Sequence, residues 1–431
     1  MSTGLIISVC MLGIVVAIAL GFKYGVNMGV TGIVFAYIVG CFMMGLKVKE
    51  VVALWPNSTI FQLMSITLFF GFAVVNGTMQ SVADHLLYAV RNKSWLISFA
   101  IYFVAIILGG LGCPPPAANA IMAVIGFSIG LPAGLHPFII AWAVCNGAAI
   151  GACLPWAASG SVVSSTIASV GFEAEASLMT WKFFFAYLLI TFVLLIVLYI
   201  VFKGNKLKKI NVEKPEPFSA IHKKSLIVIA VVIGLVLIPG LIGKFVKISW
   251  LVTFARYADI QMLAMIGFVV CSLMKLADEK QVIKAVPWNT LILVGGIATL
   301  MSVAKEAGVV DVISSWLNAN APSYAVGSLL AILGGFLSFF SGGINTVFPM
   351  LAPMVPSLAV GSIKAVTLFI AILLGACYTA ISPFSTGGAI FMSNCPDEKM
   401  RAKLIGGQLG LATYGMVVTA VLALVGVLGI F

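Results

Sequence analysis

Two short segments rich in proline, glycine and asparagine interrupt apolar runs, and both could form an anion-binding site. The first reads GGLGCPPPAANAIM and the second SGGINTVFP. Pro114–Pro116 lack amide hydrogens and have a fixed backbone angle φ, which suits the start of a helix. A helix that begins near Ala117 and Asn119 would present free N–H groups and the positive end of its dipole. Asn345 and Thr346 would do the same in the second segment, so an anion could bind without a charged side chain.

Two other apolar runs contain a proline where a membrane helix would otherwise continue. Pro155 lies in GACLPWAASGS and Pro383 in GACYTAISPFSTGG, and each is expected to unwind its helix opposite one of the first two segments. Unwound carbonyls and side-chain oxygens are ligands that suit Na⁺. We therefore predict two cation sites, formed by Asn119, Asn146, Gly151 and Ser159 in the first half and by Asn345, Gly375, Ser385 and Thr386 in the second.

The four interrupted segments are predicted to enclose one substrate between these cation sites. No predicted span has an interior arginine, so a carboxylate would be held by dipoles, amides and hydroxyls. The predicted contacts are Asn119, Ala120, Pro155, Asn345, Thr346, Thr379, Ser382 and Pro383. Simpler interpretations exist for single residues. One proline break is more often a kink than a site, Asn119 and Asn345 could be helix N-caps, and Asn146 could bridge two helices.

Acidic residues are absent from the predicted membrane interior. All 13 aspartates and glutamates fall in loops, surface helices or span ends. A proton relay usually needs an interior carboxylate, so the sequence favours coupling to Na⁺, or to protons carried by the substrate. No other cofactor is predicted. The eight cysteines are scattered singly, without the CxxC or CxxH spacing of a metal site or a disulfide framework.

The composition excludes a soluble globular protein. Hydrophobic residues make up 62% of the 431 residues and charged residues 9%, which is typical of a polytopic membrane protein. The net charge of +11 comes from lysines in loops, and it follows the positive-inside rule rather than indicating a nucleic-acid partner. The N-terminus lacks the basic region of a cleavable signal. We expect an all-α protein of the inner, or plasma, membrane.

About ten transmembrane helices and two re-entrant hairpins are predicted. The hairpins are 94–130 and 323–358, each broken in the middle and preceded by an amphipathic stretch. The full spans are expected at 4–22, 28–46, 59–77, 136–157, 178–202, 225–243, 259–275, 288–304, 364–383 and 406–430. The segments 136–157 and 364–383 are the broken spans. Lysines and arginines place the basic segment 203–224 in the cytoplasm when each hairpin returns to its own side.

The two halves of the chain form an internal repeat. IGACLPWAASGS matches LGACYTAISPFS, and each follows a broken hairpin that carries an asparagine. Five full spans per unit is an odd number, so the second copy must be inverted in the membrane. The predicted units are 1–202 and 225–431, joined by the linker 203–224. Inverted repeats with broken helices are typical of secondary transporters.

The chain also resembles a known family. LFFGFAVVNGTMQSVADHLL, ILGGLGCPPPAANAIMA and NGAAIGACLPWAASGS are similar to the malonate-carrier (MatC) type of dicarboxylate permease. This branch lies within the ion-transporter superfamily that includes the divalent anion–sodium symporters. In the second half, VPWNTLILVGGIATLMSVAKEAGVVDVISSWL and SGGINTVFPM fit the superfamily's pattern. The resemblance implies an elevator-type transporter, usually a homodimer, that carries di- or tricarboxylates.

The hairpin tips depart in part from the sodium symporters, which carry Ser-Asn-Thr at each tip. Here the matching triplets are Ala118-Asn119-Ala120 and Ile344-Asn345-Thr346. Asn119, Asn345 and Thr346 therefore carry over, whereas both serines and one threonine do not. The departure affects the expected number of sodium ions and the carboxylate contacts, and it leaves the expected architecture unchanged.

The sequence thus predicts a secondary active transporter of malonate or a four-carbon dicarboxylate, coupled to Na⁺ by symport. Alternatives are an H⁺-coupled or exchange carrier for citrate, a monocarboxylate or another organic anion, and a passive channel. A membrane-embedded enzyme is a further alternative. The three histidines near loops and the lack of interior acids argue against it. The expected partners are a small organic anion, the lipid bilayer and a second copy of the chain.

Overall fold

In the computed structural model, all regular secondary structure among the described residues is helical. These residues are 3–89, 93–205, 207–208, 214–242, 254, 257–339, 342–361 and 363–431. Three predicted features fall partly outside them. They are the basic linker (206 and 209–213), the end of the span 225–243, and residues 340–341 in the second hairpin.

The first half forms helices α1 to α10. Five helices come before the first hairpin: α1 (Thr3–Tyr24), α2 (Met28–Tyr37) with the π-helical turn η1 (Ile38–Met43), α3 (Val48–Ala53), α4 (Asn57–Val75) and α5 (Thr78–Ala89). The rest of the half consists of η2 (Ser94–Leu96), α6 (Ile97–Gly110), α7 (Pro115–Ala133), α8 (Pro137–Ala152), α9 (Ala158–Ile167), η3 (Ala168–Phe172), η4 (Glu173–Glu175) and α10 (Ala176–Val201).

The second half repeats this order. It begins with α11 (Ala220–Ile242), α13 (Ile260–Leu273), α14 (Glu279–Ala285), α15 (Trp288–Glu306) and α16 (Val309–Asn320). It continues with α17 (Ser323–Ser338), η5 (Gly343–Val347), α18 (Phe348–Leu351), η6 (Ala352–Met354), α19 (Val355–Leu358), α20 (Ala365–Thr379), α21 (Thr386–Ser393), α22 (Glu398–Leu424) and η7 (Val427–Ile430).

Several helices are long and apolar enough to cross a membrane, as expected for a multi-pass protein. Among the described residues they are Asn57–Val75, Pro115–Ala133, the kinked stretch Ala158–Val201 and Glu398–Leu424. A fifth candidate is the pair Ser323–Ser338 and Gly343–Leu358, which is bent by 117° at the break between the two helices. The bend agrees with a helical hairpin there, while the full set of ten spans stays a prediction.

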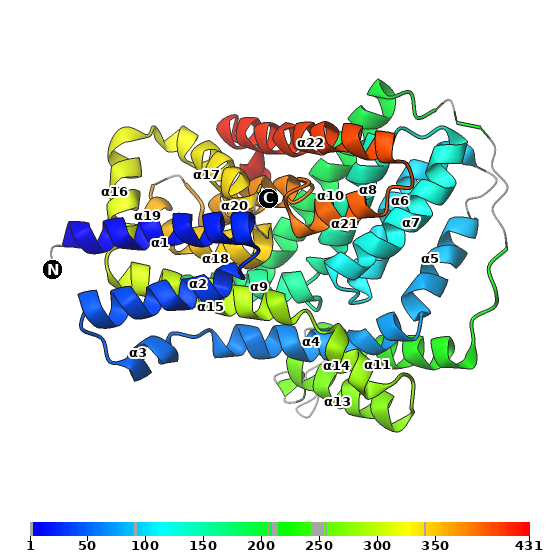
Figure 1. Ribbon diagram of the computed structural model, residues 1–431, viewed down its shortest axis with the longest axis horizontal. Helices are drawn as coiled ribbons and strands as arrows, with labels where there is room; N and C mark the ends of the chain where they lie inside the picture. Colours follow the sequence, from blue (N-terminus) through cyan, green and yellow to red (C-terminus); the bar gives the residue numbers. More distant parts are fainter. Residues whose placement is uncertain are drawn as a thin grey trace.

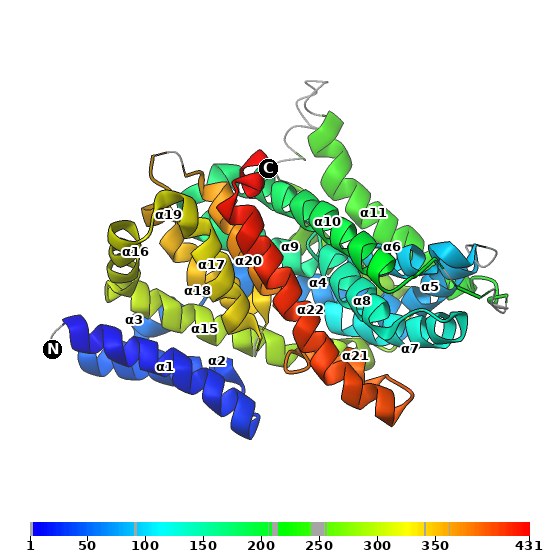
Figure 2. The same ribbon diagram turned by 90° about the horizontal axis from the view of Figure 1, so that it is seen from above.

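The two hairpins enter the molecule from opposite ends. In both views α5, which precedes the first hairpin, lies at one end of the long axis. Helices α3 and α16, with the second hairpin beside them, lie at the other end (Figures 1 and 2). This arrangement is what an inverted repeat requires, because the same element must then face opposite sides of the membrane.

The glycine of the repeated Gly-Ala-Cys sequence lies against the backbone of a hairpin helix in each half. In α8, a Cβ on Gly151 would lie 2.1 Å from the Ile106 carbonyl oxygen of α6. In α20, a Cβ on Gly375 would lie 2.2 Å from the Ala331 carbonyl oxygen of α17. No side chain fits at such a distance, so these glycines allow each hairpin to pack backbone-to-backbone on the following helix.

The first hairpin tip is fixed by one more glycine and by a tryptophan. Gly112 has a φ of +87°, and a Cβ there would lie 2.1 Å from the ring of Phe70. Trp156, just after α8, donates its indole N–H to the Gly110 carbonyl at 2.8 Å. The tip is therefore bound directly to the helix break that lies opposite it.

The other helices form a layer against which the hairpins pack. Helix α2 packs on α15 through Gly29, Gly32 and Gly296, and the Asn27 amide donates to the Asn289 carbonyl at 2.8 Å. Helix α4 packs on α9, α13, α14 and α15. We call α4 and α15 the scaffold pair, because they form the side of this layer that contacts the hairpin region.

The described part of the linker differs from the prediction at its end. Helix α11 begins at Ala220 rather than at 225, because the Ser219 hydroxyl accepts the His222 N–H at 3.1 Å and so caps the helix early. The segment is also attached to the first hairpin: Lys208 donates its backbone N–H to the Ala133 carbonyl at 2.9 Å.

Gly375→Ala is expected to lower the stability of the protein by about 1–3 kcal/mol, because the new Cβ forces α17 and α20 apart. Thermal unfolding in detergent measures the effect. Gly406→Ala on α22 is the control, since nothing lies within 4 Å of its added Cβ. Equal melting temperatures for both variants would show that the α17–α20 contact does not require glycine.

Candidate functional site

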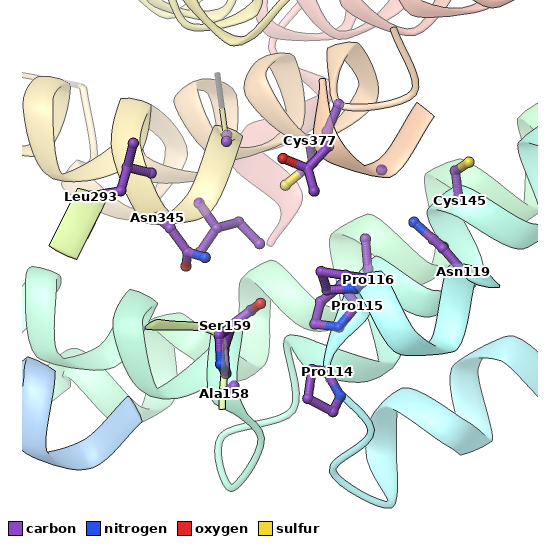
Figure 3. Close-up of a pocket in the computed structure, with 18 of the residues that line it drawn as sticks. Pro114, Pro115, Pro116, Asn119, Cys145, Ala158, Ser159, Leu293, Asn345 and Cys377 are labelled. Atoms are coloured by element: carbon purple, nitrogen blue, oxygen red, sulfur yellow. The ribbon is translucent and has the colours of Figure 1, made fainter. Parts of the chain in front are cut away.

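One cavity of about 180 Å³ lies where both hairpin tips meet both broken helices (Figure 3). Its walls come from the starts of α7, α9, η5 and α21 and from the last turns of α8 and α20, with α4 and α15 closing one side. The polar side chains among its lining residues are Thr67, Asn119, Asn146, Ser159, Asn345 and Thr386. None of its lining residues is charged.

Four helical segments begin at this cavity, so positive dipole ends converge on it. In α9 the Ser161 N–H is bonded to the Ala157 carbonyl at 3.0 Å, and the amides of the three preceding residues are left out of the helix. In η5 the Thr346 N–H is bonded to the Gly342 carbonyl at 3.0 Å. The amides of the preceding residues are again left out of the helical hydrogen bonds. The free amides at these helix starts favour an anion, whereas the carbonyl ends of α8 and α20 at the same cavity favour a cation.

The first hairpin tip offers fewer amides than the sequence predicts. Helix α7 begins at Pro115, with Pro114 as its N-cap, instead of near Ala117. Prolines have no N–H, and the Ala118 N–H is already bonded to the Pro114 carbonyl at 2.9 Å. Only the Ala117 amide therefore remains at this terminus. The proline rings line the cavity, and α9 supplies most of the donors of the first half.

Three buried oxygen atoms at the hairpin tips have no hydrogen-bond partner among the described residues. They are Asn119 Oδ1, Asn345 Oδ1 and Thr346 Oγ1. A buried polar atom without a partner costs about 1–3 kcal/mol, so the two asparagine oxygens that line the cavity are candidates for contact with a ligand. An amide offers its oxygen to a cation or a donor and its N–H₂ to a carboxylate. Asn119 is 3% exposed and points toward the cavity from α7 (Figure 3).

Asn146 differs from the two tip asparagines because its amide is already bonded. Its Nδ2 donates to the Trp142 carbonyl at 3.2 Å, and its Oδ1 accepts from the Tyr187 hydroxyl at 3.0 Å. Asn146 therefore joins α8 to α10, as the simpler sequence interpretation allowed, while one edge of it still lines the cavity.

Ser159 and Thr386 lie in the first turns of α9 and α21. Both line the cavity. The Ser159 hydroxyl and the Asn345 amide point toward each other from opposite walls (Figure 3). Ser385, the N-cap of α21, is turned away from the cavity. Its hydroxyl accepts the Gly388 N–H at 3.3 Å and donates to the Ser382 carbonyl at 2.9 Å.

The remaining residues predicted for the site do not line this cavity. They are Ala120, Gly151, Pro155, Thr346, Gly375, Thr379, Ser382, Pro383 and Ser385. The Thr379 hydroxyl donates to carbonyls of its own helix, and the Ser382 hydroxyl accepts the Phe384 N–H at 3.2 Å. The prolines lie in the breaks 153–157 and 380–385, where α8 and α20 end. Their contact with a ligand stays a prediction.

Sequence reasoning missed the scaffold side of the cavity and two thiols. Thr67 of α4 and Leu291 of α15 line it, as do Cys145 and Cys377. Both cysteines are buried. No local signal distinguishes them from the other cysteines, because their place depends on how α8 and α20 are rotated against distant helices.

The polar groups present suit a hard cation such as Na⁺. They are neutral amide and hydroxyl oxygens, whereas a transition metal would favour imidazole or thiolate ligands. The described residues contain no group of three or more His, Cys, Asp or Glu side chains that could hold such a metal. The Asn119 and Asn345 oxygens are the best fitted, since each is buried and without a partner among the described residues.

Comparisons with known proteins give a family likeness for the first part of the chain and a structural likeness for the fold. Residues 1–152 match the family model described as Dicarboxylate carrier protein MatC N-terminus, which covers the region where the sequence resembles that branch. No curated protein sequence matches the chain significantly. The crystal structure of the YdaH transporter of Alcanivorax borkumensis is similar, with a TM-score of 0.56 and 14% identity over 99% of this chain and 98% of that chain. The chain therefore has a fold like that of a transporter.

Asn345→Leu is expected to leave the melting temperature unchanged or to raise it, because it removes a buried oxygen that has no partner among the described residues. Asn146→Leu is expected to cost about 1–3 kcal/mol, because it removes the oxygen that accepts a hydrogen bond from the buried Tyr187 hydroxyl. Thermal unfolding in detergent, without added Na⁺ or organic anions, compares the two. A larger loss for Asn345→Leu would assign that residue a structural role.

Proposed function

We propose that this protein is a secondary active transporter of small dicarboxylates such as malonate or a four-carbon diacid. The observation that supports this most is the uncharged cavity at which four helical segments begin, lined by two tip asparagines whose oxygens have no hydrogen-bond partner among the described residues. The match of residues 1–152 to the dicarboxylate carrier family supports the substrate class. The likeness to the YdaH transporter supports the fold.

The two halves of the cavity fit the two ends of a dicarboxylate. One carboxylate would meet the α9 amides and Ser159 together with the η5 amides and Asn345, since α9 packs against η5. The other would meet the Asn119 amide group and Thr386, since α7 packs against α21. Each carboxylate would thus receive hydrogen bonds from both halves of the chain, which favours a molecule charged at both ends over a monocarboxylate.

Na⁺ would bind beside the substrate and offset its charge. Two carboxylates lose hydration in a cavity without a fixed positive charge, and helix dipoles compensate only part of this cost. The Asn119 and Asn345 oxygens, with carbonyls near the ends of α8 and α20, could each take one Na⁺. Substrate and ions would then stabilise each other's binding, which is the physical basis of symport.

Transport would follow an elevator mechanism in the inner membrane, with the linker 203–224 in the cytoplasm. The scaffold pair α4 and α15 covers only one side of the cavity. The hairpins with α8, α9, α20 and α21 would slide along it as a unit, and a homodimer would hold the scaffold in place.

Uptake of labelled malonate into proteoliposomes is expected to require an inward Na⁺ gradient and to be reduced at least about tenfold by Asn119→Ala or Asn345→Ala, because each removes a charge-assisted contact. Asn320→Ala on α16 is the matched control, since it bonds only within its own helix. Succinate, fumarate, malate, citrate and lactate are tested as competitors.

Each alternative gives a different result in the same assay. Uptake driven by a pH gradient or by exchange would keep the carrier and reject Na⁺ coupling. Inhibition by citrate or lactate alone would change the substrate class. Chemical conversion of the labelled compound would indicate an enzyme, and equilibration without accumulation would indicate a channel.

Cross-linking tests the sliding step. Ala158→Cys on α9 and Leu291→Cys on α15 place two thiols in the walls of one cavity, in a chain whose native cysteines are replaced by alanine. A short bis-methanethiosulfonate reagent is expected to stop uptake, and dithiothreitol to restore it, because the link joins the moving part to the scaffold. The single variants are the controls. Unchanged uptake at full cross-linking would contradict the elevator mechanism.

A further inference from the structure

A second cavity, of about 260 Å³, lies along the same scaffold pair as the first. Its polar side chains come from α4, the end of α9, the last turns of α15 and η3. They are Thr59, Thr166, Ser169, Ser302 and Lys305. Nothing in the predicted function uses these residues.

The two cavities occupy successive levels of the same three helices. Helix α15 contributes Leu291 to the first cavity and Ser302 to the second, and α9 contributes Ser159 and then Thr166. At about 1.5 Å per residue the α15 pair is roughly 16 Å apart along the helix axis. The second cavity is lined by Leu54 and Pro56, which directly follow α3, and α3 and α16 lie at the same end of the molecule (Figure 1).

The polar groups of the second cavity suit an anion. Lys305 is the single charged side chain among its lining residues, it is exposed, and no salt bridge is found for it within the described parts of the chain. Thr166 is 8% exposed, and its hydroxyl has no hydrogen-bond partner among the described residues. Thr59 donates to the Ser165 hydroxyl at 3.2 Å. An ammonium group and a hydroxyl in the cavity wall can both donate hydrogen bonds to an anion.

We infer that this cavity is an anion-binding vestibule for the transported dicarboxylate, with Lys305 as the residue that attracts it and Thr166 as a second donor. The inference rests on the proposed function. The vestibule would hold one carboxylate loosely on the α3 and α16 side, at the level that the main cavity would reach by sliding along α15. A lysine suits this place, because an exposed charge raises the local anion concentration without binding too tightly for release.

Lys305→Gln is expected to raise the KM for the dicarboxylate about 3- to 20-fold at low ionic strength, with kcat changed less than about twofold. The effect is expected to shrink at high salt, because salt screens an exposed charge. Lys305→Arg keeps the charge and is expected to restore the KM. Lys49→Gln is the matched control, since it removes an exposed lysine at the same end of the molecule, on α3, that lines neither cavity.

A second measurement does not depend on transport. Thr166→Cys is placed in a chain whose native cysteines are replaced by alanine, and the reaction of its thiol with an anionic and a cationic methanethiosulfonate of similar size is timed. The anionic reagent is expected to react faster. Lys305→Gln is expected to lower the ratio of the anionic to the cationic reaction rate at least about threefold.

The two measurements separate the possible failures. Wild-type protein without dicarboxylate uptake would overturn the proposed function and, with it, the dicarboxylate as occupant. An anion preference of the Thr166→Cys variant that still depended on Lys305 would then assign the vestibule to another anion. An unchanged KM in Lys305→Gln, or equal reaction of both reagents with the Thr166→Cys variant, would overturn the vestibule itself.

Discussion

Backbone amides and carbonyls cannot remain unpaired in hydrocarbon, and the rest of this structure depends on that constraint. The chain interrupts its helices in four places within apolar sequence, and it brings all four interruptions to one cavity. There the unpaired groups of one segment face those of another across a space that a polar ligand can fill. Each break is tolerated because the others lie beside it.

The same arrangement replaces fixed charge by dipoles. A buried arginine or carboxylate would need a permanent partner in this environment, and it would hold a substrate or an ion too tightly to release it. Helix ends and neutral amides give a weaker field of the right sign. The one charged residue among those that line the two cavities, Lys305, lies at the far end of α15, where it is exposed and screened by salt.

Rigid packing and unsatisfied polar groups are divided between different residues. Gly151 and Gly375 fix each hairpin to the following helix by backbone contact, and Tyr187 fixes Asn146. Against this rigid frame, Asn119 and Asn345 keep an oxygen without a partner among the described residues. The frame therefore holds the tip amides ready for a ligand, at a cost in stability that ligand binding would recover.

The sequence by itself determined the helix breaks and the two tip asparagines. Pro155 and Pro383 end their helices because the proline ring prevents the helical hydrogen bond wherever it occurs, which is a local effect. Only the tertiary structure decided which polar groups face the cavity. Asn146 is bonded to Tyr187, Thr379 bonds within its own helix, and Cys145 and Cys377 line the cavity. These orientations depend on the rotation of each helix against α4, α10 and α15, partners far away in the chain, and no local pattern of residues specifies that rotation.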